Sequence, residues 1–252
     1  MSRILIPLPA DGFDPTESGV PWRLLTARGH TVVFATPDAR PVSADPLMVT
    51  GKGLGILAPV LRANADGRAA YQAMHQSAAF NAPIAWDQAR LEDFDALLLP
   101  GGHAKGMRPY LESAVLQALV VSFMTYNKPL GAICHGVVLA ARARLPSGHS
   151  VLRGRKTTAL TRQMEMTAWR LTALYLGDYY RTYPTPVEDE VRSVLASPSD
   201  FLSGPTSFAR DSESKPQIGF TVRDGNYLSA RWPGDAHRFA IAFDEMLQHG
   251  AA

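Results

Sequence analysis

The chain has 252 residues, of which 46% are hydrophobic and 19% are charged, and these proportions are typical of a soluble globular protein. Its net charge of +2, without a run of basic residues, argues against nucleic acid as a partner. The single cysteine excludes an intrachain disulfide and a cysteine-based zinc site, and no stretch approaches the roughly 18 apolar residues of a membrane span.

Strand-like and helix-like patterns alternate along the chain. This alternation predicts an α/β fold with a mainly parallel sheet covered by helices on both faces, an extra hairpin and an inserted irregular segment. In chain order, we predict a strand at 3–9, a helix at 17–28, a strand at 31–36, a helix at 65–79, a strand at 94–99, a helix at 113–126, a strand at 130–133, a helix at 137–143, a strand at 156–160, a helix at 165–176, two strands around an Asp-Gly turn within 220–230 and a helix at 236–248.

Two regions do not fit this alternation. Residues 37–64 are rich in proline and glycine, and residues 177–217 contain many Pro, Ser, Tyr and Asp residues. We therefore expect one domain over residues 1–252, with 37–93 and 177–217 as insertions or cap segments. The apolar run near the N-terminus is too short for a signal peptide, and a free thiol suits a reducing compartment, so we expect a cytoplasmic protein without a membrane partner.

The only cysteine, Cys134, lies between a strand-like run and a helix-like run with almost no loop between them. A side chain at such a junction stands at a helix N-terminus, where the dipole favours an anion, here the thiolate. The arrangement is that of a nucleophile elbow, with Gly131 and Gly136 on either side of the turn. The alternative is an ordinary buried core cysteine.

Three features are expected at the carboxyl ends of the strands, where open α/β sheets place their sites. They are Cys134 with His135, the turn Gly101-Gly102-His103, and the acidic turn that contains Glu17. A nearby carboxyl group can exchange a proton with the thiol, and the backbone N–H groups of the glycine turn and of His135 can bind an oxyanion.

Simpler interpretations of these features stay open. Glu17 taken alone is better explained as an acidic residue in the first turn of a helix. The glycines are also explained by a tight turn alone, and His135 by a surface or capping position. The spacing of His30, His75 and His103 matches no metal-site pattern, so we predict neither a metal nor a cofactor.

The sequence Ala-Ile-Cys-His-Gly at 132–136, together with Leu-Leu-Leu-Pro-Gly-Gly-His at 97–103, resembles the DJ-1/PfpI superfamily. That superfamily has the class I glutamine amidotransferase-like fold, which implies a flavodoxin-like sheet. The stretches 12–17 and 100–107 are more similar to the branch of Hsp31-type chaperones and glyoxalase III proteins. The resemblance also implies a homodimer.

The resemblance implies a role for each matching residue. Cys134 corresponds to the nucleophile, Glu17 to the carboxyl that hydrogen-bonds it, and Gly102 and the His135 backbone to the oxyanion site. A carboxylate after the next strand pairs with the histidine in that branch, usually as Asp. Glu165 falls there, with Asp235 as the substitute. Some members bind metal through two histidines and a glutamate, but here at most one position matches, namely His103.

The implied function is a cofactor-independent, glyoxalase III-like enzyme that acts on small reactive aldehydes, converting methylglyoxal to lactate through an adduct on Cys134. Two alternatives remain: a holding chaperone or redox-stress sensor, and a cysteine amidase or peptidase of the PfpI type. A glutamine amidotransferase subunit is disfavoured, because the late histidine His237 is followed by Arg238 and not by the expected His-x-Glu pattern.

Overall fold

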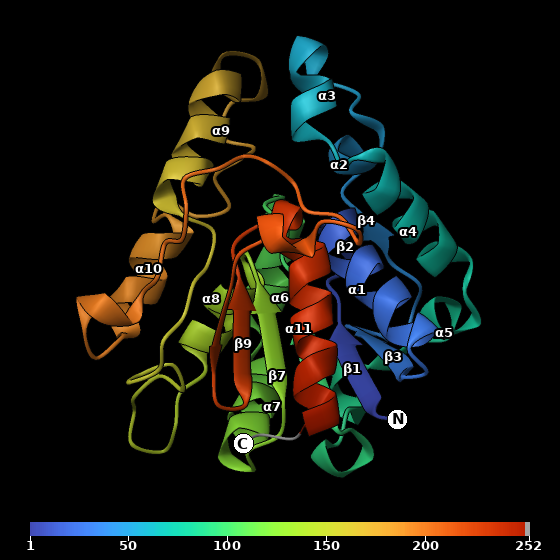
Figure 1. Ribbon diagram of the computed structural model, residues 1–252, viewed down its shortest axis with the longest axis vertical. Coiled ribbons are helices and arrows are strands. Elements are labelled where there is room, and N and C mark those ends of the chain that lie inside the picture. The colour runs from blue at the N-terminus through green and yellow to red at the C-terminus, as the bar shows by residue number, and fades with distance from the viewer. Residues whose placement is uncertain (250–252) are drawn as a thin grey trace.

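A computed structural model describes residues 1–249, and its central feature is a seven-stranded sheet (Figure 1). Neighbouring strands pair in parallel, except for the last two strands of the chain, which are joined by a turn at Gly225 and pair with each other in antiparallel orientation. The predicted α/β fold and its hairpin are therefore confirmed. In spatial order the strands are β5 (Ile84–Ala85), β3 (Thr31–Thr36), β1 (Arg3–Pro7), β6 (Ala96–Leu99), β7 (Leu130–Ile133), β9 (Tyr227–Ala230) and β8 (Thr221–Asp224).

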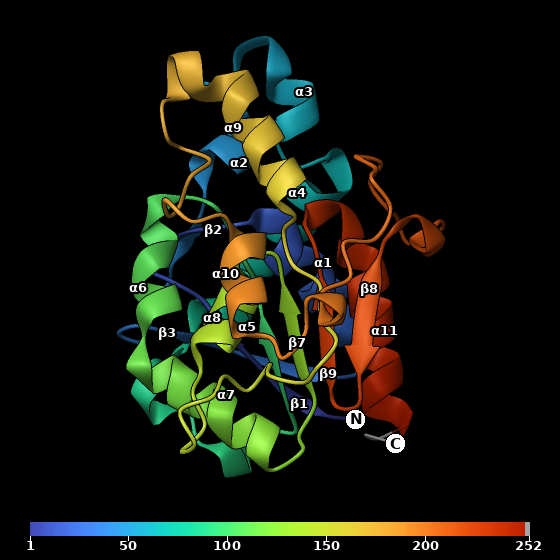
Figure 2. The ribbon, with the colours of Figure 1, turned by 90° about the vertical axis from the view of Figure 1, so that its left-hand side faces the viewer.

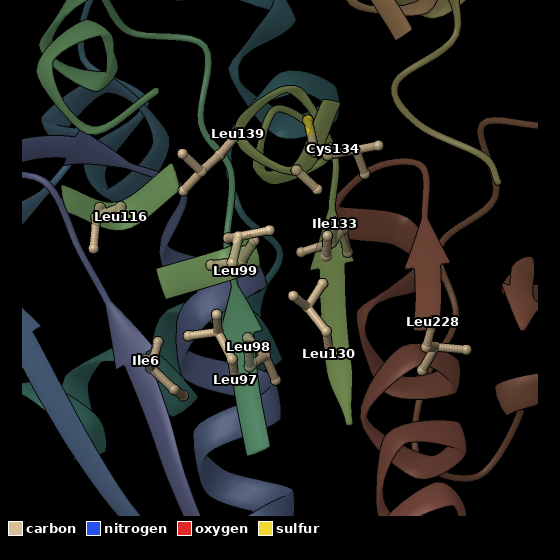
Figure 3. Packing of buried hydrophobic residues seen from close by; sticks show 14 of the residues in the cluster. Ile6, Leu97, Leu98, Leu99, Leu116, Leu130, Ile133, Cys134, Leu139 and Leu228 are labelled. Carbon is tan, nitrogen blue, oxygen red and sulfur yellow. The ribbon is translucent and has the colours of Figure 1, made fainter. Parts of the chain in front are cut away.

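The middle of the sheet is made by β6 and β7, which are buried along their whole length. Their apolar side chains pack between the two helical layers (Figure 3), and each buried leucine contributes roughly 1.5–3 kcal/mol. The register pairs Leu99 with Ala132, so the two strands end side by side. The chain after β6 therefore meets the chain after β7, which brings the glycine turn to Cys134.

Helices cover both faces of the sheet (Figures 1 and 2). The close fit is clearest at Gly131 in β7, where a Cβ would lie 2.9 Å from Phe239 and from Phe243. None of the helices within residues 1–249 has the length and apolar character needed to cross a membrane. One face carries α1 (Pro15–Ala27), α4 (Ala65–Gln76) and α11 (Ala236–His249), and the other carries α6 (Arg108–Glu112), α7 (Ala114–Thr125), α8 (Gly136–Arg142) and α10 (Val187–Val194).

Three further helices, α2 (Pro46–Thr50), α3 (Ala58–Leu61) and α9 (Arg162–Leu176), lie together at one end of the molecule (Figure 2). We call these three helices the cap. They share a small hydrophobic cluster of their own, separate from the main core, centred on Met48, Leu54 and Tyr180. Beneath the cap, the short strand β2 (Asp11–Phe13) pairs with β4 (Ser43–Ala44). The cap thus joins residues that are more than 100 positions apart in the sequence.

The predicted strand at 156–160 is wrong. The place beside β7 belongs to β9, and β8 pairs with the other side of β9, so this segment lies outside the sheet. The segment is held by Thr157, whose N–H donates to Asp200 and whose carbonyl accepts from Leu202, and by Thr158, whose N–H donates to the hydroxyl of Ser229. Its β-branched residues pack as an extended stretch without a ladder.

Other differences lie in or next to the two irregular regions. The helix predicted at 65–79 is two helices, because Ser77 leaves the helical conformation and caps α5 (Ala78–Asn81). The short helices α2 and α3 lie within 37–64, which we expected to be irregular. The helix α10 was not predicted, although its buried Val187 and Val191 are four residues apart and three acidic residues occupy its first turn.

Candidate active site

Cys134 and His135 connect β7 to α8, and Cys134 lies in the left-handed region, with a φ of +57°. A non-glycine residue in that region costs about 1–3 kcal/mol. Its N–H donates to the carbonyl of Ala230 at 3.1 Å, which fixes the strand end. Gly136 leaves no space for a side chain, since a Cβ would lie 2.1 Å from the Leu99 carbonyl oxygen. The structure thus places the thiol at the end of the central strand, above the leucine core (Figure 3).

Glu17 comes from the first turn of α1, where Asp14 caps the helix by accepting from the N–H groups of Thr16 and Glu17. The Glu17 side chain is fully buried beside Cys134, and its Oε2 accepts from the Gly101 N–H at 2.8 Å. Burial raises its pKa well above the usual value, and the neighbouring Asp14 raises it further. Burial therefore favours the protonated form of Glu17, while hydrogen bonding by the Cys134 side chain and the Gly101 N–H acts on its pKa in the opposite direction. Oε1 has no other protein hydrogen-bond partner within residues 1–249 and is free to carry the proton.

This protonation predicts a pH-dependent stability difference between wild type and Glu17→Gln. In the unfolded chain Glu17 ionises near its ordinary pKa of 4.5, whereas in the folded chain it keeps its proton to higher pH. The wild type therefore loses stability relative to the variant as pH rises above about 4.5. In thermal unfolding, the Tm of the variant should rise relative to the Tm of wild type between pH 4 and pH 8. A difference in Tm that stays constant over this range would contradict the assignment.

The Cys134 thiol does not fit the expectation of a thiolate at rest. Burial raises its pKa well above the ordinary value, and the carboxyl groups of Glu17 and Asp14 raise it further, while the N–H of His135 acts in the opposite direction. The physical reason is that α8 has only seven residues, so the favourable field at its N-terminus does not offset the cost of burying an anion. The resting site holds a neutral thiol.

His135 can accept the thiol proton. Its Nδ1 lies 3.5 Å from Sγ of Cys134, and its Nε2 lies 3.0 Å from the hydroxyl of Thr182. That hydroxyl donates its own hydrogen to the carbonyl of His103 at 2.6 Å, so it accepts from Nε2. Nε2 therefore carries the ring hydrogen, and Nδ1 is left with a free lone pair toward the thiol. Burial lowers the pKa of His135 to about 3, which keeps the ring neutral.

Replacing Thr182 by valine tests this assignment of the tautomer. Valine has a similar shape but cannot accept a hydrogen bond from Nε2. The ring of His135 then loses the hydrogen bond that keeps its hydrogen on Nε2 and its Nδ1 lone pair free. We expect a fall in kcat of about 3–10-fold, the usual worth of one hydrogen bond, with KM nearly constant. Thr182→Ser should restore kcat. A valine variant with wild-type kcat, or a serine variant as impaired as valine, would contradict the positioning role.

Two predicted partners of His135 have other roles. Glu165 lies in the same cavity as Cys134, but its Oε2 accepts from the N–H of Val187 at 2.8 Å and so holds the start of α10. Asp235 forms a buried ion pair with Arg231 at 2.9 Å. The expectation of a carboxylate on the histidine is therefore corrected to the hydroxyl of Thr182. Threonine has no sequence signature for this role, and the residue lies in the region where we predicted no elements.

The glycine turn is packed so tightly that side chains are excluded. A Cβ on Gly101 would lie 2.7 Å from the His135 nitrogen, and one on Gly102 would lie 2.6 Å from the Gly12 carbonyl oxygen. The next residue, His103, stacks on Tyr180 with ring centroids 4.4 Å apart, and its buried Nε2 has no protein partner within the described chain. Gly102 and His103 border the same cavity as Cys134.

The cavity over Cys134 has a volume of about 120 Å³. A cavity of this size holds more than a single water and suits a molecule of a few carbon atoms. Asp14 and Glu17 line it together with Cys134, and further lining comes from the cap and from Phe208, Arg210 and Trp232 in the late part of the chain. Within residues 1–249, no three His, Cys, Asp or Glu side chains are grouped as a metal site would require.

Comparison with known proteins shows which family this chain belongs to. The family described as ThiJ/PfpI family-like matches residues 8–204, which is most of the chain. The chain belongs to the ThiJ/PfpI family. The predicted membership of the DJ-1/PfpI superfamily is thereby confirmed.

Similar proteins include the deglycase TK1284 of Thermococcus kodakarensis, which is 25% identical over 98% of this chain and 99% of its own length. The protein/nucleic acid deglycase 2 of Escherichia coli is 40% identical over 29% of this chain and 38% of its own length. Among solved structures, glyoxalase III from Candida albicans superposes with a TM-score of 0.64 at 15% identity, covering 96% of each chain, and so shares the fold.

Proposed function

We propose that this protein is a cofactor-independent cysteine enzyme that converts small 2-oxoaldehydes, such as methylglyoxal, to 2-hydroxy acids. The observation that carries the proposal is the combination of a thiol, a neutral imidazole with its lone pair toward that thiol, and a protonated carboxyl around a cavity of about 120 Å³. The relatives named as deglycases support chemistry on reactive carbonyl compounds.

The first step forms the adduct. Nδ1 of His135 takes the thiol proton as Sγ of Cys134 bonds to the aldehyde carbon. The aldehyde oxygen gains the electron pair of its π bond, is held by the N–H groups of Gly102 and His135, and takes the proton of Glu17. The product is a hemithioacetal, with an imidazolium and a Glu17 carboxylate beside it. Because the thiol is neutral at rest, the charge develops only when substrate is in place.

The second step moves hydrogen from one substrate carbon to the other. The Glu17 carboxylate removes the proton from the adduct carbon, while the imidazolium of His135 protonates the neighbouring carbonyl oxygen, which gives an enediol. Return of the Glu17 proton to the second carbon, with loss of the first hydroxyl proton to His135, gives a thioester of a 2-hydroxy acid. Water, deprotonated by Glu17, releases the acid, and Cys134 regains its proton from His135. The net change adds one water.

Lactate formation tests the proposal. With methylglyoxal as the substrate, EDTA present and no added thiol, the wild-type protein should form one lactate for each methylglyoxal consumed. The proposal would be contradicted if methylglyoxal were consumed without lactate being formed, in an amount that matches the arginine side chains it modifies. The Escherichia coli and Thermococcus relatives justify a parallel assay on methylglyoxal-treated N-acetylcysteine, in which the same adduct would form on the released aldehyde.

A peptide substrate is less well supported than a small aldehyde. The cavity around Cys134 is too small for a peptide segment, although a neighbouring groove of about 440 Å³ shares Met164 and Phe208 with it. A larger substituent on the substrate would lie in that groove. Amidase activity on short peptide amides, dependent on Cys134, would favour the alternative.

A holding chaperone is supported by apolar side chains exposed around the cap. We expected such a patch within 177–217, but only one of these residues belongs to that region. If the cap holds unfolded chains, Cys134→Ala should suppress aggregation of a heated client as well as wild type does, because the thiol plays no part. Failure of both proteins to suppress aggregation would remove this function. The exposed residues are Ile56, Val60, Leu171, Leu174, Tyr175 and Phe208.

A further inference from the structure

Arg210 borders the same cavity as Cys134, but the proposed chemistry does not use it. Its Nη2 donates to the backbone carbonyls of Val60 and Arg62 at 3.3 and 3.2 Å, and its guanidinium lies over the ring of Trp232, 5.2 Å from the centroid. These contacts hold the side chain in place through neutral groups only. Its Nη1 is buried and has no hydrogen-bond partner within residues 1–249.

No nearby acidic side chain neutralises the charge of Arg210 through an ion pair. Asp14, Glu17, Asp211 and the phenol of Tyr180 all act on its charge, but none forms an ion pair with it among the described residues. Asp14 is bonded to the first turn of α1, and Asp211 is bonded to His237. Glu17 and Tyr180 hold their protons at neutral pH, because burial raises the pKa of each. Arg210 is partly buried, and a buried charged N–H group without a partner is costly unless an anion binds to it.

We propose that Arg210 binds the carboxylate of the substrate, so that the preferred substrates are small 2-oxoaldehydes with a short carboxylate tail. The two free N–H groups of Nη1 can donate to a carboxylate, and Arg210 lines the same small cavity as the thiol, so a single short molecule can reach both. The inference rests on the proposed function for the identity of the reactive end, whereas the anion site itself does not depend on turnover.

The test compares a substrate that has the tail with one that lacks it. The probes are 4,5-dioxopentanoate and methylglyoxal, and the measured quantity is the ratio of their kcat/KM values in wild type, Arg210→Met and Arg210→Lys. We expect wild type to prefer the carboxylate substrate, Arg210→Met to lower the ratio roughly 10–100-fold, and Arg210→Lys to lower it less. Arg90→Met, at an exposed arginine, is the matched control. A ratio unchanged in Arg210→Met would overturn the inference.

A binding measurement separates this inference from the proposed function. Titration calorimetry of Cys134→Ala protein should detect 4-oxopentanoate, which has the tail but no aldehyde, and should not detect 2-pentanone. Adding Arg210→Lys should weaken the binding, which keeps the test valid if Arg210→Met fails to fold. No binding of 4-oxopentanoate would overturn the inference. Binding without turnover of either aldehyde would support the anion site and contradict the proposed function.

Discussion

Cys134→Ser is expected to retain less than about 0.1% of the wild-type kcat/KM for lactate formation, a loss comparable to removal of the nucleophile in other enzymes with covalent intermediates. The serine hydroxyl holds its proton far more tightly than a thiol. The neutral His135, whose pKa is lowered by burial, removes a proton from a hydroxyl far less readily than from a thiol. The same ring suffices for the thiol because sulfur gives up its proton more readily.

The serine variant should fold normally, since the side chains are similar in size and the left-handed φ of +57° is set by the chain on either side. A Tm within a few degrees of wild type would show that the lost activity comes from chemistry. Retention of a tenth or more of the wild-type activity by a folded Cys134→Ser protein would contradict a covalent role for the sulfur.

Glu17→Gln is expected to lower kcat by about 10²–10⁴-fold, the usual contribution of a general acid–base group. The amide oxygen of glutamine can still accept from the Gly101 N–H, so the turn that contains Gly101 and Gly102 should keep its place. The amide cannot donate a proton to the aldehyde oxygen and then remove one from carbon. The loss should therefore fall on kcat, with KM nearly constant.

The pH dependence distinguishes this loss from a change in packing. If Glu17 is the acid in wild type, kcat/KM should fall at high pH as the carboxyl loses its proton, and this limb should be absent from Glu17→Gln. Retention of the limb would assign it to another group, such as the thiol itself.

Much of the sheet is predictable because its central strands are continuous apolar runs. Leu97 to Leu99 and Leu130 to Ile133 have no face that tolerates water, so they belong in the middle of a sheet. The junction at Cys134 follows, because a strand and a helix without a loop between them force a turn at one residue. Residues 156–160 also look like a strand, but the place beside β7 is occupied by β9, which occurs much later in the chain.

The site was less predictable than the sheet, because Thr182 and Arg210 reach it from the late region through tertiary packing. Neither residue type marks its role: a threonine that accepts from an imidazole looks like any other threonine in sequence. The protonation state of Cys134 was also misjudged from local rules. A helix N-terminus is worth about 0.3–1 kcal/mol to an anion, whereas burial of a charge costs several kcal/mol.

The most direct measurement is the mass of folded Glu17→Gln protein, taken by native mass spectrometry shortly after mixing with methylglyoxal, because a hemithioacetal reverts to thiol and aldehyde once the protein is unfolded. In this variant the imidazolium of His135 can protonate the adduct oxygen in place of Glu17, so the hemithioacetal should form slowly and then stall before hydrogen transfer. We predict that Glu17→Gln gains the mass of one methylglyoxal more than Glu17→Gln/Cys134→Ala does. An equal gain of mass in both proteins would contradict covalent catalysis at Cys134.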